Sequence, residues 1–338
     1  MTGPHEPPGG PTVAPAADAA WRPALDRGAL GRRAAALAQV RGFFSARGVL
    51  EVDTPQLVRH AVSDPALHSA EVHWPGVRTR AGYLHTSPEY AMKRLLAAGS
   101  GDIYQLCHVF RGDEQGPLHN PEFMLLEWYR TGWSMQQLCG EVDALLRALH
   151  PVPLPPAQML GYEQAFSGHL GVSALEDPLP RLAGRALAAG CDAQLVARCS
   201  RDELLDLMMG MLIGPQLGLA GPVFLHGYPA SQAALARLDP ADPRTALRFE
   251  LYLRGVELCN GFEELADAAE QRARFAADRA ARAARGLADV VADEWLLAAL
   301  ASGLPACSGV AVGVDRLLML AEGQQRLDAV LPFRSDNA

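Results

Sequence analysis

Apolar residues recur at helical spacing in several parts of this chain. The first such segment covers residues 29–47, and Gly48 follows where many helices end in a left-handed residue. Ser87-Pro88 has the character of a helix start, and the same spacing continues beyond it. Further helices are predicted over residues 88–98, 134–149, 181–189, 201–213, 263–286, 292–301 and 313–321.

Shorter apolar or alternating runs predict strands over residues 49–52, 83–86, 103–111, 122–130, 248–258 and 308–312. Between the third and fourth runs, Gly112, Gly116, Pro117 and Pro121 indicate a long hairpin loop. Residues 151–247 are only weakly patterned. The strands and helices lack the regular alternation of a doubly wound sheet, so we expect an α+β fold with antiparallel pairing.

The composition is that of a globular chain. Of the 338 residues, 49% are hydrophobic and 20% are charged. No run approaches the roughly 18 apolar residues of a membrane span, so we expect no membrane association. The formal net charge of −8 argues against general nucleic-acid binding, which depends on Lys and Arg neutralising phosphates.

The N-terminus predicts a disordered tail, because residues 1–20 are rich in Pro, Ala and Gly; order is expected from Trp21 onwards. No apolar stretch follows a basic one there, and the six cysteines show no C-x-x-C spacing. Both features predict a cytoplasmic protein with free thiols. Lys93 is the single lysine among 30 basic residues, a bias that we attribute to codon usage.

The first candidate for chemistry is the run 122–130. Strand alternation puts Phe123, Leu125, Glu127 and Tyr129 on one face. A carboxylate and a phenol among apolar neighbours suit a partly buried cation. The alternative is a strand whose polar residues face water.

The second candidate is acidic and comprises Glu250, Glu257, Asn260 and Glu264. Clustered carboxylates suit hard divalent cations, which prefer oxygen ligands. Glu250 and Glu257 have opposite strand parity, so a bulge or turn at Gly255 is needed to bring both to one site. The alternative is a set of ordinary surface acids.

The third candidate is the small-residue run 309–316, Gly-Val-Ala-Val-Gly-Val-Asp-Arg. Small residues allow a ligand to approach the backbone closely. Arg316 would lie in the first turn of a helix, where a guanidinium can pair with phosphate. The sequence contains no P-loop, G-x-S-x-G or H-E-x-x-H motif.

Taken in order, three segments resemble motifs 1, 2 and 3 of class II aminoacyl-tRNA synthetases. They are Gly-Val-Leu-Glu-Val-Asp-Thr-Pro (48–55), Phe-Arg…His-Asn-Pro-Glu-Phe…Glu-Trp-Tyr (110–129) and Gly-Val-Asp-Arg (313–316). Glu-Leu-x-Asn-Gly-Phe-x-Glu-Leu (257–265) is similar to the lysyl-tRNA synthetase group. The likeness covers residues 21–338 and implies the class II antiparallel sheet flanked by helices.

Only about 20 low-complexity residues precede the catalytic domain, where lysyl-tRNA synthetases carry an anticodon-reading OB domain. A catalytic domain alone resembles the elongation factor P–(R)-β-lysine ligase family. Trp21-Arg22-Pro23, the segment 86–95 and Ser308-Gly309-Val310-Ala311 are also closer to that family. The ligases carry Ala where the synthetases carry Gly, here at Ala311, and the added methyl favours the β-amino isomer over α-lysine.

The resemblance implies ATP and Mg²⁺. Arg111 would bridge the substrate carboxylate and the α-phosphate, Phe123 would stack on adenine, and Arg316 would reach the γ-phosphate. Glu250 and Glu257 would hold Mg²⁺. Further nucleotide contacts are implied for Asp113, Glu114, His119, Asn120, Glu257, Leu258 and Gly313.

The same resemblance implies how a lysine-like substrate is bound. Its ε-ammonium would lie against Glu127, Tyr129 and Glu264, and its carboxylate against Asn260. Its other amino group would lie near Ser87 and Glu89. Either Asp113 or Glu114 would read the adenine amino group. A basic residue is usual before His-Asn-Pro, but Pro117-Leu118 stands here, which leaves His119 as a phosphate partner.

The implied reaction activates (R)-β-lysine, or lysine, as an adenylate and transfers it to a lysine of elongation factor P. A homodimer through motif 1 is expected, and tRNA is not expected as a partner. One alternative is a minimal lysyl-tRNA synthetase, which the missing anticodon domain and the acidic charge disfavour. The other is a catalytically silent paralogue, which the retained Arg111, Arg316, Glu250 and Glu257 disfavour.

Two basic features remain. Arg279, Arg282 and Arg285 recur three residues apart on the predicted helix 263–286, as either a solvated face or a docking surface for the protein substrate. Lys93 lies four residues after Glu89, on a helix that borders the substrate site. We therefore expect Lys93 to be the residue at risk of self-modification by the adenylate.

Overall fold

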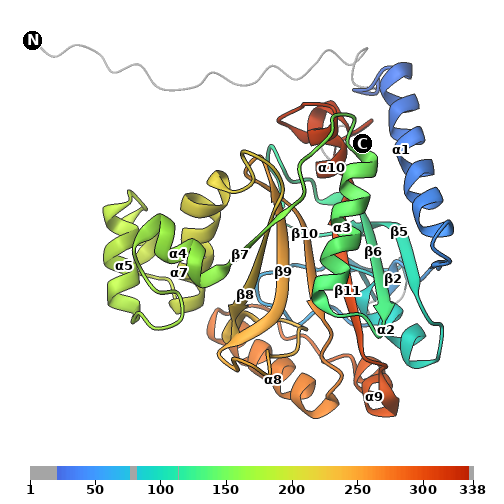
Figure 1. Cartoon of the computed structure of the whole chain (residues 1–338). Coiled ribbons are helices and arrows are strands. Elements are labelled where there is room, and N and C mark those ends of the chain that lie inside the picture. Colours follow the sequence, from blue (N-terminus) through green and yellow to red (C-terminus); the bar gives the residue numbers. More distant parts are fainter. Residues whose placement is uncertain (1–20, 77–81, 113, 335–338) are drawn as a thin grey trace, which may run out of the picture.

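The computed structural model describes residues 21–76, 82–112 and 114–334 (Figure 1). Its centre is an eight-stranded sheet with the order β1-β5-β6-β11-β10-β9-β8-β7. In that order the strands are Leu50–Glu51, Ile103–Phe110, Glu122–Thr131, Cys307–Gly313, Val256–Glu263, Thr245–Leu253, Val223–Pro229 and Gln158–Gly161. A second sheet, β2-β4-β3, comprises Leu57–Val58, Gly82–Leu84 and Glu71–Val72.

The sheet is antiparallel from β5 to β8, and only the outer pairs β1/β5 and β7/β8 are parallel. The expected α+β class with antiparallel pairing is confirmed. The long connection between β5 and β6 lies where Gly112 and Pro121 predict a hairpin loop.

Helices α1 (Arg27–Ser45), α3 (Met135–Leu149) and α10 (Val314–Ala321) share the main core with one face of the sheet. Trp128, Val310 and Cys259 point to this face and are almost completely buried. Ser134 begins α3 with a capping box, in which Gln137 is the reciprocal partner.

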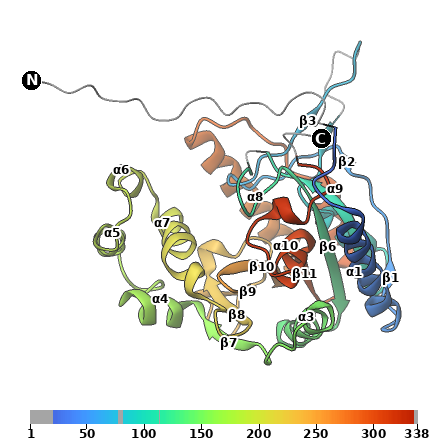
Figure 2. The ribbon, with the colours of Figure 1, turned by 90° about the horizontal axis from the view of Figure 1, so that it is seen from above.

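The opposite face is bordered by two groups of helices. Helices α2 (Glu89–Ala97), α8 (Ala268–Ala284) and α9 (Glu294–Gly303) pack near Ile103 and Tyr129. Helices α4 (Tyr162–Leu170), α5 (Leu179–Ala188), α6 (Ala193–Val196) and α7 (Arg201–Met208) form a lobe with its own core beside β8 and β9, as Figure 2 shows. The strip of sheet between the two groups carries most of the candidate site residues.

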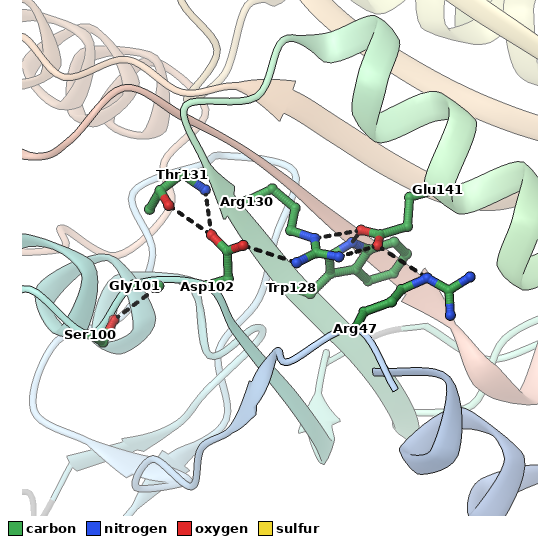
Figure 3. A network of polar contacts seen from close by, with 8 residues as sticks. All are labelled: Arg47, Ser100, Gly101, Asp102, Trp128, Arg130, Thr131 and Glu141. Carbon is green, nitrogen blue, oxygen red and sulfur yellow. Dashed lines mark hydrogen bonds and ion pairs between the residues drawn. The ribbon is translucent and has the colours of Figure 1, made fainter. Parts of the chain in front are cut away.

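Strand β6 is fixed to α3 by a buried ionic network (Figure 3). The Arg130 guanidinium binds both oxygens of Glu141 on α3, and it donates to Asp102 over 2.9 Å. Glu141 also accepts a hydrogen bond of 3.0 Å from the Trp128 indole. Because Trp128 and Arg130, two residues apart on one face of β6, bind the same carboxylate, the strand that carries Glu127 cannot slide along the helix.

Most predicted elements are present, but three boundaries were wrong. The predicted strand 248–258 is two strands, because Arg254 and Gly255 turn the chain with φ angles of 51° and 76°. The predicted helix 263–286 begins only at Ala268, where Asp267 caps it. The predicted helix 201–213 leaves α-geometry after Met208 and continues as a π-helical turn.

The weakly patterned region contains four elements that the pattern did not predict, β7, β8, α4 and α6. The expected disordered tail, residues 1–20, lies outside the described residues. Within the described ranges, no helix combines the length and apolar character needed to cross a membrane.

Candidate active site

One row of side chains crosses five strands on the face opposite α3. The strand register pairs Glu250 with Asn260, Asn260 with Ala311, Ala311 with Glu127, and Glu127 with Gln105. Residues paired directly across antiparallel strands point to the same face. Residues predicted from three separate segments therefore lie side by side.

Glu127 lies near the middle of this row and is only 2% exposed. One of its carboxylate oxygens accepts a 2.7 Å hydrogen bond from the Ser87 hydroxyl, and the other accepts one of 2.7 Å from the Tyr129 hydroxyl. Burial, and then the charge of Glu89, raises the pKa of Glu127 to about 7. The alternative in which this strand presents its polar residues to water is wrong.

Lys93 contributes an ammonium group to the same place. Its Nζ lies 2.7 Å from Glu89 and 2.6 Å from Glu264, and its side chain is 1% exposed. Burial opposes the charge, but the carboxylates of Glu264 and Glu89 outweigh it and raise the pKa of Lys93. A buried, protonated amine is a poor nucleophile, so these ion pairs disfavour the self-modification of Lys93, which stays a prediction.

We call this set the acid pocket: Ser87, Glu89, Lys93, Glu127, Tyr129 and Glu264. Glu264 follows β10 and is buried, and burial raises its pKa to about 8 although Lys93 acts in the opposite direction. Gly309 provides the necessary space, because a Cβ there would overlap the Tyr129 ring and lie 2.6 Å from Glu264. Three carboxylates therefore converge on a site with one resident cation.

Asn260 and Ala311 border the acid pocket within the row. The Asn260 Oδ1 is buried and has no hydrogen-bond partner among the described residues. An orphaned buried acceptor of this kind is uncommon and indicates a ligand or water partner. Ala311 packs with Phe123 and Leu125 on the same face, so its methyl group lies between the pocket and the predicted adenine site.

Arg111 and Phe123 lie together, as the predicted nucleotide site requires. The Arg111 guanidinium carbon is 5.1 Å from the centre of the Phe123 ring, and its Nε donates to the Thr86 carbonyl over 3.4 Å. Glu114 is 3.7 Å from the same guanidinium. The alternative reader of adenine, Asp113, lies outside the described residues.

Arg316 connects the β5–β6 loop to β10. It donates to the Leu118 carbonyl over 3.1 Å and to the Glu257 carbonyl over 3.0 Å, and it lies 2.7 Å from the His119 ring. Burial, followed by the charge of Arg316, lowers the pKa of His119. His119 is therefore a neutral neighbour of this arginine.

Three other residues predicted to contact the nucleotide differ in whether their side chains are available to it. The Asn120 amide donates to the Glu122 carbonyl over 2.6 Å, which fixes the end of the loop. Gly313 is the residue before α10 and leaves the start of that helix open. The Leu258 side chain is buried in the core with α3, so it cannot contact a nucleotide on the other face.

The predicted metal ligands, Glu250 and Glu257, approach each other through the turn at Gly255 and a bulge after Glu257. Partial burial, and then the charge of Glu250, raises the pKa of Glu257. Glu250 already binds Arg248 over 2.6 Å and Tyr252 over 2.8 Å. Within the described ranges no group of three or more His, Cys, Asp or Glu side chains is arranged to hold a metal ion. A cation at this pair would need further ligands, and Mg²⁺ is usually bound by one or two carboxylates together with waters and phosphates.

The arginines of α8 and of the residue that caps its end differ in exposure. Arg282 is buried and donates to the carbonyls of Ala288 and Asp64, so it cannot belong to a docking surface. The others form ion pairs within the chain, namely Arg272–Glu294, Arg274–Glu270, Arg279–Asp289 and Arg285–Glu203. For Arg279 and Arg285 the docking hypothesis stays a prediction.

The antiparallel sheet, the acid pocket and the two arginines that border the β5–β6 loop, Arg111 and Arg316, define a synthetase-type catalytic domain. Residues 22–337 match the family of class II tRNA synthetases (D, K and N), and the chain belongs to that family. It is 50% identical to the elongation factor P–(R)-β-lysine ligase of Edwardsiella ictaluri (strain 93-146) over 325 residues, which are 95% of this chain and 99% of the relative. Proteins of the same name from Salmonella gallinarum (strain 287/91 / NCTC 13346) and Klebsiella pneumoniae (strain 342) are 47% identical with the same coverage.

The sequence singled out Lys93 and Gly309 but did not predict what they do. Lys93 was expected on a helix that borders the substrate site, but its ion pairs with Glu89 and Glu264 were not predicted, because its spacing from Glu89 is equally typical of a solvated helix face. Gly309 was expected to let a ligand approach, whereas it makes room for Tyr129 and Glu264. A glycine opposite an aromatic residue is a usable signal only once the strand register is known.

Proposed function

We propose that this chain is an ATP-dependent, AMP-forming ligase that activates (R)-β-lysine and transfers it to a lysine side chain of elongation factor P. The acid pocket carries this proposal, because the carboxylates of Glu89, Glu127 and Glu264 gather beside Lys93, and Glu127 lies on the same strand as Phe123, over which Arg111 packs. Such a pocket suits a substrate with more than one ammonium group. The names of the relatives support the same substrate and acceptor.

We propose a role for each group of the acid pocket, as the resemblance implies. Glu127, with Tyr129 oriented toward it, and Glu264 bind the ε-ammonium. Ser87 and Glu89 bind the second amino group, and the row continues to Asn260, which meets the carboxylate. The raised pKa values of Glu127 and Glu264 mean that an arriving ammonium group replaces protons in the pocket.

In the first step a carboxylate oxygen of the substrate attacks the α-phosphorus of ATP. A P–O bond forms, and pyrophosphate leaves with the electron pair of the broken bond. Arg111 and Arg316 provide fixed positive charge for the phosphate oxygens, and the carbonyls of Thr86 and Leu118 hold the two guanidinium groups in place. Glu250 and Glu257 would hold Mg²⁺, which supplies further charge neutralisation when bound.

In the second step the lysine amine of elongation factor P attacks the adenylate carbonyl. An amide bond forms, the amine loses a proton, and AMP leaves. Residues 48–55 would form a homodimer interface, and the protein would act in the cytoplasm without a membrane or tRNA partner. Two other outcomes are distinguishable, a synthetase that charges tRNA and a silent paralogue.

One assay separates these three outcomes. Amino-acid-dependent exchange of pyrophosphate into ATP is measured with (R)-β-lysine and with α-lysine, and elongation factor P or tRNA is then added as acceptor. We expect faster exchange with (R)-β-lysine and transfer to elongation factor P alone. Exchange with neither amino acid would indicate a silent paralogue, and transfer only to tRNA would indicate a synthetase. An Arg111→Ala variant serves as the inactive control.

A further inference from the structure

Lys93 is the one cation paired with the carboxylates of the acid pocket among the residues that the structure describes. We propose that Lys93 is a positioning residue for amino-acid binding. Its ammonium group bridges Glu89 and Glu264 and offsets one of the three carboxylate charges, which leaves two for the substrate. This inference rests on the proposed function and extends it to the number of cationic groups that the substrate carries.

The geometry favours this role over simple packing. Nζ bridges carboxylates from two elements that are distant in sequence, Glu89 on α2 and Glu264 after β10. Both side chains are more than four-fifths buried, and that of Glu264 is only 1% exposed, so water can offer these carboxylates little in place of Lys93. Loss of one member of a buried ion pair leaves the remaining charge uncompensated, which is strongly unfavourable.

The net charge of the acid pocket follows from its carboxylates and its lysine. Glu89, Glu127 and Glu264 carry three negative charges when ionised, and Lys93 carries one positive charge. The two negative charges that remain match the two ammonium groups of a diamino acid. Without Lys93 the three carboxylates repel one another more strongly, so the pocket retains more protons at neutral pH than it does with Lys93. Substrate would then have to displace these additional protons before it binds.

Other titratable groups also face this cluster and bear on its pH dependence. From the surrounding elements they are Tyr90 of α2, Cys107 of β5, Tyr129 of β6 and Cys307 of β11. Burial raises the pKa of each, so all four stay neutral near pH 7. The carboxylates and Lys93 therefore control the charge of the pocket in that range.

The test compares Lys93→Met and Lys93→Ala with the unmodified protein in the exchange assay between pH 6.5 and 9. We expect the KM for (R)-β-lysine to rise on the order of tenfold at pH 7, as for a shift of about one pKa unit, and to recover as the pH rises. The KM for ATP should stay unchanged. Circular dichroism and the melting temperature identify a variant that fails to fold.

Chemical rescue makes the test specific for charge. Propylammonium should lower the KM of Lys93→Ala, whereas 1-propanol, which is similar in size and neutral, should not. Propylammonium should only compete with substrate in the unmodified protein. A folded Lys93→Met variant with an unchanged KM and pH profile would overturn the role of Lys93. No exchange in the unmodified protein would instead overturn the proposed function.

Discussion

Gly309 of β11 lies directly opposite Tyr129 of β6, and the missing side chain of the glycine is what leaves room for the tyrosine ring. The same space accommodates Glu264, which would lie 2.6 Å from a Cβ on Gly309. Two of the groups that would bind the ε-ammonium thus depend on the absence of one carbon atom.

We expect Gly309→Ala to displace Tyr129 and Glu264 and to raise the KM for the amino acid by about 10- to 100-fold, since small misplacements at a site have effects of that order. The KM for ATP should change little, because Arg111 and Phe123 are elsewhere on the sheet. Gly140→Ala on α3 is the matched control, because a Cβ there meets no atom within 4 Å. Equal KM values for both variants would contradict this account.

Replacement of Glu127 should have opposite effects on the stability of the protein and on substrate binding. An ordinary glutamate ionises near pH 4.5, whereas the pKa of Glu127 in the folded protein is about 7. Between these values the folded protein retains a proton that the unfolded chain has lost, so stability falls as pH rises through this window. Glu127→Gln removes that loss, and its melting temperature relative to the unmodified protein should rise from pH 5 to pH 8.

The same variant should bind the amino acid less well above pH 7, because an amide cannot pair with ammonium as a carboxylate does. Parallel melting and exchange measurements on Glu122→Gln, an exposed residue of the same strand, provide the control. If Glu127→Gln were less stable than the unmodified protein at pH 8 without bound substrate, the buried, ionised carboxylate of Glu127 would not be destabilising.

Local pattern predicted those parts of the site that depend on one element. Alternation along β6 places Phe123, Glu127 and Tyr129 on one face, and the ring, carboxylate and phenol do share it. The turn between β9 and β10 was expected at Gly255 from the parity of two glutamates, and it is there. The preceding Arg254 is not a typical turn residue, so the apolar run across it resembled one continuous strand.

Local sequence pattern could not predict which residues of different strands and helices lie side by side. The register that brings Asn260 beside Ala311 and Glu127 depends on pairing among three strands that are far apart in sequence. The inward direction of Lys93 depends on how α2 packs, and its spacing from Glu89 is equally compatible with a solvated helix. The roles of the site residues were predicted from the resemblance to a known family, whereas the contacts between these residues became visible only in the structure.

Ala311 predicts a change in substrate preference. Its methyl group lies in the row between Asn260 and Glu127, beside the proposed position of the substrate backbone. Ala311→Gly should improve exchange with α-lysine relative to (R)-β-lysine by about tenfold, within the roughly 1–3 kcal/mol that one methyl group can contribute to discrimination. The ratio of kcat/KM values is the measurement. An unchanged ratio would mean that another residue distinguishes the isomers.

The Arg130–Glu141 network, on the face of β6 opposite the pocket, predicts a large loss of stability when it is broken. Glu141→Ala leaves the Arg130 guanidinium buried without its main partner, and it also removes the acceptor for the Trp128 indole. We expect a loss of about 3–5 kcal/mol in the free energy of unfolding, measured by urea titration. Glu176→Ala, which removes an exposed ion pair with Arg244, should cost less than about 1 kcal/mol. Similar losses in the two variants would show that burial of the network contributes nothing, because the two deletions remove the same type of side chain and differ mainly in their exposure to water.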